Sequence, residues 1–242
     1  MFRKMFSRKW LFTTLLVLAG TAVCVRLGIW QLDRLAGRRA FNTQVETMRA
    51  AAPLNLNEFT PDDLASMEWR AVTVSGEYDF ENQVALRNQY SEGVYGFHLI
   101  TPLLYNGTAV LVNRGWIPAE SDSVPQDWRA YDESGGVTVT GQIRLGQGKP
   151  AFGGVADALP MDGTRLEVWH NLDLEKMSAQ FPYPILDAFI QPNAGEDAAP
   201  PIPYQPIIEL TEGSHFGYAL QWFTFAAILF CGYPFYLKKQ DD

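Results

Sequence analysis

A single histidine stands at the start of the last apolar run of the chain. From Phe216 to Leu237 there are 22 residues without a charge, and His215 immediately precedes them. Tyr218 and Trp222 follow at spacings that place them on the same helix face as His215. A neutral imidazole can ligate haem iron, and the two aromatic rings could pack against the macrocycle. The alternative is a helix-start residue in the interfacial belt of a membrane, where Tyr and Trp are enriched anyway.

Two arginines and a tryptophan recur at four-residue spacing at the end of the first apolar run. Arg26, Trp30 and Arg34 therefore share a stripe of one helix. If the two apolar helices pack antiparallel, Arg26 is expected level with His215, and arginine binds carboxylates such as haem propionates in a fork-to-fork geometry. Two alternatives stay open, namely snorkelling to lipid headgroups with Trp30 as an anchor, and pairing of Arg26 with Asp33.

A third cluster closes an apolar strand with Asn113, Arg114, Gly115 and Trp116. These residues would form a docking surface for a partner protein, or they are a strand end with a glycine bend and a packed tryptophan. His98 and His170 lie in strand patterns without metal-ligand spacing, so we expect satisfied histidines of a sheet. The sequence has no GxSxG or phosphate-binding glycine loop, which argues against hydrolytic chemistry.

The net charge and the positions of the cysteines exclude further classes of function. Between the apolar runs there are 13 Lys and Arg against 25 Asp and Glu, which leaves this segment at −12. Such an acidic module repels nucleic acid, so no nucleic-acid partner is expected. Cys24 and Cys231 both lie inside apolar runs, and there is no CxxC or CxxCH for redox exchange or covalent haem attachment.

Both apolar runs are long enough to cross a bilayer, and both have basic residues on their terminal sides. The positive-inside rule then places both termini in the cytoplasm and everything between outside it. A cleaved signal peptide is the alternative for the first run, but its cleavage site is poor. The first run begins too early for a mitochondrial presequence, which favours a bacterial inner (plasma) membrane. The predicted segments are a cytoplasmic N-terminus (1–9), a transmembrane helix (10–30), a helical stalk (31–52), an extracytoplasmic β domain (53–191), a proline-rich tether (192–214), a second transmembrane helix (215–237) and a cytoplasmic C-terminus (238–242).

The segment between the helices is patterned as strands. Alternating or apolar runs separated by turn signals predict a mainly antiparallel β domain, barrel-like or sandwich-like, with short helices. Asn106-Gly107 predicts a two-residue hairpin turn, and Pro53 is expected to end one long helix over roughly residues 8–50. The expected strands are 69–78, 83–89, 96–105, 108–114, 136–145, 165–171 and 185–191, with short helices near 57–67 and 173–181 and a polar acidic loop over 120–135.

Three motifs in order resemble one family. The segment 27–34 (LGIWQLDR) is similar to the LGxWQxxR signature of the surfeit-locus (Shy family) cytochrome c oxidase assembly factors. The segment 112–118 (VNRGWIP) resembles their VNRGWxP, and 215–222 (HFGYALQW) resembles their HxxYAxQW. Each motif alone is weak, but together they cover the β domain and both apolar helices.

The resemblance implies a membrane-embedded chaperone of the respiratory chain that assists maturation of haem-copper oxidase subunit I, with no catalytic turnover. It implies transient binding of haem A, with the residue matching His215 as the candidate iron ligand and with subunit I and other assembly factors as partners. A scaffold that binds no haem and only stabilises nascent subunit I is the alternative. Family members also serve quinol oxidases, so the client oxidase stays open.

Overall fold

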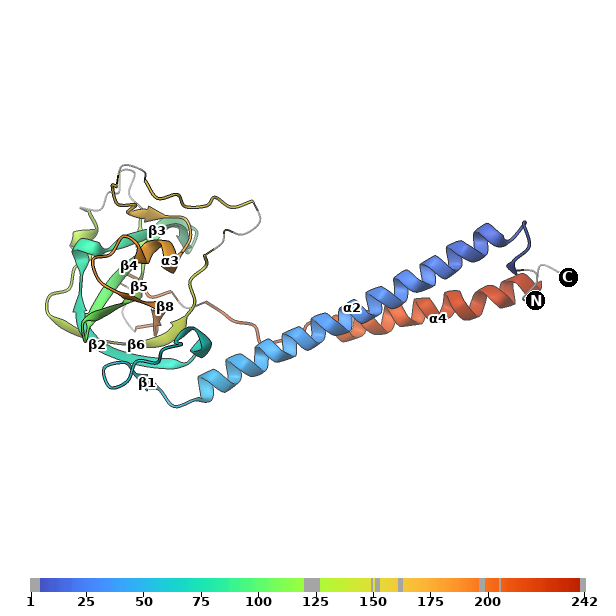
Figure 1. The fold of residues 1–242 in the computed structure, drawn as a ribbon, viewed down its shortest axis with the longest axis horizontal. Helices are drawn as coiled ribbons and strands as arrows, with labels where there is room; N and C mark the ends of the chain where they lie inside the picture. The colour runs from blue at the N-terminus through green and yellow to red at the C-terminus, as the bar shows by residue number, and fades with distance from the viewer. Residues whose placement is uncertain are drawn as a thin grey trace. The chain divides into compact units, whose positions relative to one another are not determined.

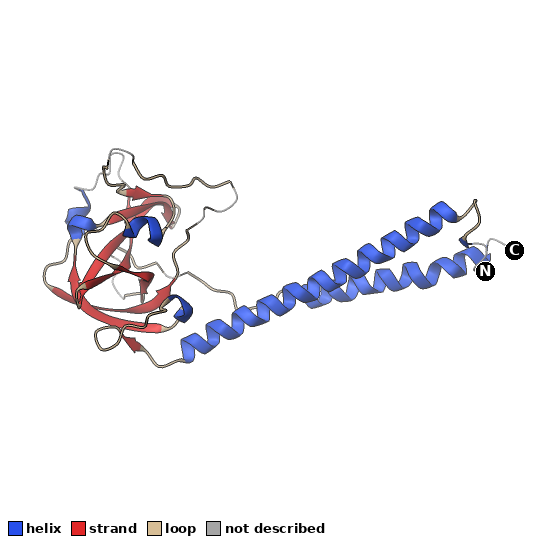
Figure 2. Cartoon of the chain, in the orientation of Figure 1, coloured by secondary structure: helices blue, strands red, loops and turns tan. Residues whose placement is uncertain are grey.

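The computed structural model describes residues 5–119, 127–148, 150, 153–160, 163–195, 199–204 and 206–239. The chain forms two compact units, a helical unit of residues 1–44 and 208–242 and a β unit of residues 45–207 (Figures 1 and 2). Residues outside the described ranges include parts of the predicted termini (1–4 and 240–242), part of the predicted acidic loop (120–126) and parts of the predicted tether (196–198 and 205).

The helical unit is an antiparallel pair. Helix α2 runs without a break over Leu11–Ala50, as predicted, and Pro53 follows its end. Helix α4 covers His215–Lys239. The two helices lie side by side with their ends reversed (Figure 1), since the Thr14 hydroxyl is 2.7 Å from the Tyr233 hydroxyl near one end of the pair.

The helices meet along a narrow stripe, which we call the seam. Its residues are buried or half-buried and recur at spacings of three and four, the heptad pattern of helices that pack at a shallow angle. Gly28 lets the helices approach, because a Cβ built there would lie 2.7 Å from the Phe223 ring. The seam residues are Thr14, Val17, Thr21, Cys24, Gly28, Gln31 and Leu35 on α2, and His215, Ala219, Trp222, Ala226, Leu229 and Tyr233 on α4.

Outside the seam, both helices present apolar side chains outward. Leu16 and Phe12 on α2 are 62% and 78% exposed, and Leu220 and Ile228 on α4 are each 61% exposed. Both helices are long and apolar enough to cross a bilayer. Apolar faces of this extent are unfavourable in water, so the helical unit is suited to association with a membrane.

The β unit is a barrel (Figure 2). Five strands form a closed ring in the order β2-β6-β8-β5-β4, and β4 pairs again with β2. Most ladders are antiparallel, as predicted, but β5 pairs with β8, β1 with β2 and β3 with β7 in parallel. The strands are β1 (Leu54–Asn55), β2 (Ala71–Tyr78), β3 (Val84–Ser91), β4 (Val94–Tyr105), β5 (Thr108–Pro118), β6 (Gly136–Arg144), β7 (Val168–Trp169) and β8 (Ile185–Pro192).

The β4–β5 hairpin forms the longest ladder of the barrel. Asn106 and Gly107 both have positive φ, 46° and 80°, as the predicted two-residue turn requires. Inward-facing Val, Leu and Ile residues fill the barrel, among them Leu103, Val110 and Ile190, each at most 1% exposed. The short helices are η1 (Ala65–Met67), η2 (Phe80–Asn82), η3 (Asp127–Tyr131) and α3 (Leu174–Ser178).

Three local predictions need correction. The expected strand 165–171 contracts to β7, because Trp169 turns inward to a fully buried position and Asp157 binds the backbone that follows. The expected helix 57–67 contracts to η1, and the Asp63 carboxylate accepts a hydrogen bond from the Ser66 amide. The expected tether is not free throughout, since Ile202 forms an antiparallel bridge with Trp116.

Candidate functional site

His215 is held across the seam by a glutamine of the other helix. Its Nδ1 lies 2.8 Å from Oε1 of Gln31, and both side chains are half-buried. An amide oxygen only accepts, so Nδ1 carries the proton and donates. The described residues offer no hydrogen bond to Nε2, which keeps its lone pair. Metal-binding histidines are commonly oriented in this way, with one ring nitrogen donating to a fixed oxygen and the other left for the metal.

The register of the helix pair places Gln31, and not Arg26, level with His215. Arg26 lies five residues earlier, which displaces it by about 7 Å along the helix axis. It also lies on the face opposite the seam. Both Arg26 and Arg34 are exposed. In the described part of the chain neither arginine has an ion pair, so the alternative pairing of Arg26 with Asp33 does not form.

Two of the predicted aromatic residues flank the seam instead of lining it. Tyr218 is 50% exposed and Trp30 is 45% exposed. In an antiparallel pair, the residues that precede the seam positions of both helices share one flank. Tyr218 precedes Ala219 and Arg34 precedes Leu35, so these two lie on the same flank, with Trp30 one turn from Arg34. That flank therefore carries two exposed aromatic side chains and an exposed arginine.

Trp222 belongs to the seam. It is half-buried and packs edge-to-face on Phe225, with ring centroids 6.0 Å apart. The chain that enters α4 is fixed to α2 by two arginines. Arg38 donates to the carbonyl oxygens of Glu209 and Thr211, and Arg39 forms a two-bond ion pair with Glu212. These contacts hold the segment just before His215 in place.

The third predicted cluster is buried in the β unit. Asn113, Arg114 and Trp116 are 4%, 5% and 8% exposed, and Gly115 has a φ of +125°. The glycine bend and the packed tryptophan fit the alternative interpretation, but the four residues lie within β5 and not at its end, because the strand continues to Pro118. These side chains do not form an exposed docking surface, because β5 is flanked on both sides and turns them into the barrel wall and interior.

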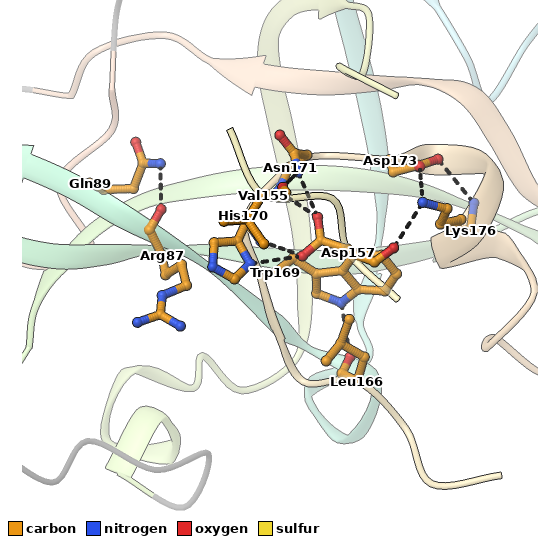
Figure 3. A network of polar contacts seen from close by, with 10 residues as sticks. All are labelled: Arg87, Gln89, Val155, Asp157, Leu166, Trp169, His170, Asn171, Asp173 and Lys176. Carbon is orange, nitrogen blue, oxygen red and sulfur yellow. Dashed lines mark hydrogen bonds and ion pairs between the residues drawn. The ribbon is translucent and has the colours of Figure 1, made fainter. Parts of the chain in front are cut away.

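Gln31 was not predicted as a site residue, although it stands in the first motif. Nothing in the local pattern marks a glutamine whose partner is 184 residues away. Asp157 was not predicted either; its side chain is 2% exposed and organises a loop of the β unit (Figure 3). Its carboxylate accepts from the backbone amides and side chains of His170 and Asn171 at 2.8–3.1 Å.

These bonds give a pH-dependent stability. Burial alone would raise the pKa of Asp157, but the hydrogen bonds from His170 and Asn171 outweigh it and hold the pKa below its ordinary value. A carboxylate with a lowered pKa stabilises the fold above its unfolded pKa of about 3.9, and this contribution is lost as the pH falls through the folded pKa. We expect the melting temperature of the wild type to fall more between pH 5 and pH 3 than that of Asp157→Asn. Equal falls would contradict this role.

The fold defines a class of protein in which the sequence of a β barrel is inserted between two apolar helices that pair antiparallel. Comparison with known sequences then gives the family. The SURF1 family matches residues 18–227. Because this match covers most of the chain, the protein belongs to the SURF1 family.

Relatives occur in bacteria and in eukaryotes. An uncharacterized SURF1-like protein of Mycobacterium bovis is 27% identical over 225 residues, which cover 90% of this chain and 80% of that protein. A SURF1-like protein of Rickettsia felis is 24% identical over 94% of this chain and 97% of its own length. Surfeit locus protein 1 of Gallus gallus is 26% identical over 70% of this chain and 57% of its own length.

Proposed function

We propose that this protein is a non-enzymatic assembly factor of haem-copper oxidases that binds haem A transiently and passes it to subunit I. The observation that carries the proposal is the His215–Gln31 hydrogen bond, which leaves Nε2 of a half-buried imidazole without a partner in the described chain. A haem iron takes an imidazole nitrogen as its axial ligand.

The surroundings of His215 suit a haem. Tyr218 and Trp30 are half-exposed aromatic side chains on the flank of the helix pair, where they would cover a macrocycle face. Arg34 is exposed on the same flank and would pair with a propionate. Trp222 supports the pair from within the seam. Arg26 lies on the opposite face, so we assign it to lipid headgroups and not to the haem.

Release of the haem is favoured by a single axial histidine. Two protein ligands would hold a haem more tightly, so His215 alone would bind it and still allow its release. We place both termini in the cytoplasm and the barrel outside it, in a bacterial inner membrane, on the basis of the basic residues that flank the two helices. The barrel is then the part that contacts other assembly factors outside the membrane.

The first test is the absorption spectrum of protein purified from a host that makes haem A. The wild type should carry haem A, and His215→Ala should carry at least tenfold less. If His215→Ala fails to fold, His215→Gln keeps a group that can bond to Gln31 and serves as the second variant. Wild type without haem, in a host whose oxidase requires the protein, would leave the haem-free scaffold as its function.

Gln31 provides a sharper test of the site. Gln31→Leu removes the acceptor that fixes the tautomer of His215, so haem affinity should fall about 10-fold to 100-fold. Gln44→Leu is the matched control, because Gln44 is exposed on the same helix and bonds to nothing in the described chain. An unchanged haem affinity and spectrum in Gln31→Leu would show that the hydrogen bond does not orient the ligand.

A further inference from the structure

The β unit contains a cavity that the haem site does not use. Its volume is about 300 Å³, which is at the lower end of the range for sites that bind small molecules. Residues of β3, β4, β5 and β8 contribute to its wall. Its polar lining residues include His98, Asn113, Arg144, His170, Gln191 and Tyr204.

A chain of hydrogen bonds fixes the orientation of the groups in this wall. The Tyr204 carbonyl can only accept, so the Gln191 amide donates to it and turns its Oε1 toward Asn113. Asn113 must then present its Nδ2 to that oxygen, at 3.2 Å. The same Nδ2 lies 3.3 Å from Nδ1 of His98, which therefore accepts. His98 thus carries its proton on Nε2.

Two polar atoms of this hydrogen-bond network have no partner among the described residues. Asn113 Oδ1 is buried and has no hydrogen-bond partner among the described residues. The described residues likewise offer none to Nε2 of His98, a residue that is 3% exposed. One atom is an acceptor and the other a donor, and their side chains come from adjacent strands of the barrel wall. A ligand that fits both atoms carries a hydrogen-bond donor for Asn113 Oδ1 and an acceptor for His98 Nε2–H.

The cavity has no uncompensated charge for an ionic ligand. Burial lowers the pKa of His98 to about 4, so its imidazole is neutral at pH 7. The Arg144 guanidinium is paired with Glu68 at 3.2 Å and stacks on the Trp69 ring at 3.5 Å. His170 is oriented by the buried carboxylate of Asp157 (Figure 3). A neutral polar ligand is therefore favoured over an anion or a cation.

We propose that this cavity binds a neutral carboxamide group, whose carbonyl oxygen accepts from His98 Nε2–H and whose NH₂ donates to Asn113 Oδ1. The group is either the side chain of an Asn or Gln of a partner protein or a free small amide. Asn113 then has a role in recognition through the cavity, although its side chain is not on the outer surface. This site is independent of the haem site on the helix pair.

The test uses the full-length protein in detergent micelles with ¹⁵N-labelled histidine. The chain has three histidines, so variants of His170 and His215 assign the imidazole signals of His98. The probe is N-acetyl-glutamine-N-methylamide, and N-acetyl-glutamate-N-methylamide is its charged counterpart. We expect the glutamine probe to shift the His98 Nε2 signal with a Kd on the order of 1 mM, as befits so small a ligand, and the glutamate probe to bind at least tenfold more weakly.

Two variants separate recognition from folding. Asn113→Leu removes the acceptor and should weaken binding at least tenfold, whereas Asn193→Leu is the control on an exposed asparagine outside the cavity. If Asn113→Leu does not fold, the affinities of the two probes for the wild type still test the proposal. No shift with the glutamine probe, or tighter binding of the glutamate probe, would overturn the proposal.

A longer peptide distinguishes the two sources of the amide. An eight-residue peptide with a central glutamine should shift His98 at concentrations similar to those of the short probe if a protein side chain is the natural ligand. A shift with the short probe alone would identify a small free amide. Both results support recognition of a carboxamide, and neither depends on whether the protein binds haem.

Discussion

Gly115→Ala is expected to destabilise the β unit by about 3–5 kcal/mol, which is a large part of the total stability of a domain. Gly115 has a φ of +125°, a backbone conformation that other residues rarely adopt. A Cβ built there would lie 2.2 Å from the carbonyl oxygen of Ile202 and 2.4 Å from its carbonyl carbon. These are backbone atoms, so no side-chain rotation relieves the clash.

The clash also breaks a bridge. The Trp116 amide donates to the Ile202 carbonyl at 2.7 Å, and the Ile202 amide donates back at 2.8 Å. Moving Ile202 away from a new methyl group would cost both hydrogen bonds and loosen the segment after β8. Thermal melting followed by tryptophan fluorescence should show a melting temperature lower by about 10 °C.

Gly107→Ala is the matched control for this substitution. Gly107 also has positive φ, +80°, but a Cβ there would meet nothing within 4 Å. Its cost is limited to backbone strain, about 1 kcal/mol. If both substitutions lowered the melting temperature equally, the close approach of Ile202 would not be the reason that position 115 holds glycine.

Local patterns predicted most elements of this fold. The Asn106-Gly107 turn follows from the two residues themselves, because both must adopt positive φ. Helix α2 was predicted as one continuous helix because nothing in its sequence interrupts it before Pro53. The prediction of a strand over 165–171 was wrong, because the local pattern does not reveal that Asp157 accepts hydrogen bonds from the backbone after Trp169.

The site was predicted less completely than the fold. The spacing of His215, Tyr218 and Trp222 does place them on one face of a helix, but the seam follows a heptad and leaves Tyr218 on its flank. The position of Arg26 along the helix axis, relative to His215, depends on the register between the two helices. The sequence of one helix alone does not encode this register. The burial of Asn113 and Arg114 similarly depends on how strands distant in the sequence close the barrel. Interactions across long sequence separations set these positions.

Arg114→Met is expected to destabilise the β unit by about 3 kcal/mol. The guanidinium is almost fully buried and donates to Gln83 Oε1 at 3.2 Å, to the Tyr131 carbonyl and to Glu133 at 2.7 Å. Its flat face lies over the rings of Tyr78 and Phe80, with centroid distances of 5.2 and 5.0 Å. Methionine fills part of the volume but leaves the Tyr131 carbonyl without its donor.

Arg129→Met is the matched control, because its side chain is 60% exposed and its ion pair with Glu81 is 4.0 Å long. Exposed pairs of this kind contribute about 0–1 kcal/mol, so its melting temperature should stay close to that of the wild type. Arg114→Lys separates charge from geometry, since lysine keeps the charge but cannot bond to three acceptors in a planar fork. If Arg114→Lys lowers the stability of the β unit nearly as much as Arg114→Met does, the planar fork of hydrogen bonds, and not the charge, holds β5 to the segment around Tyr131. A small loss of melting temperature in both variants would contradict a structural role for Arg114.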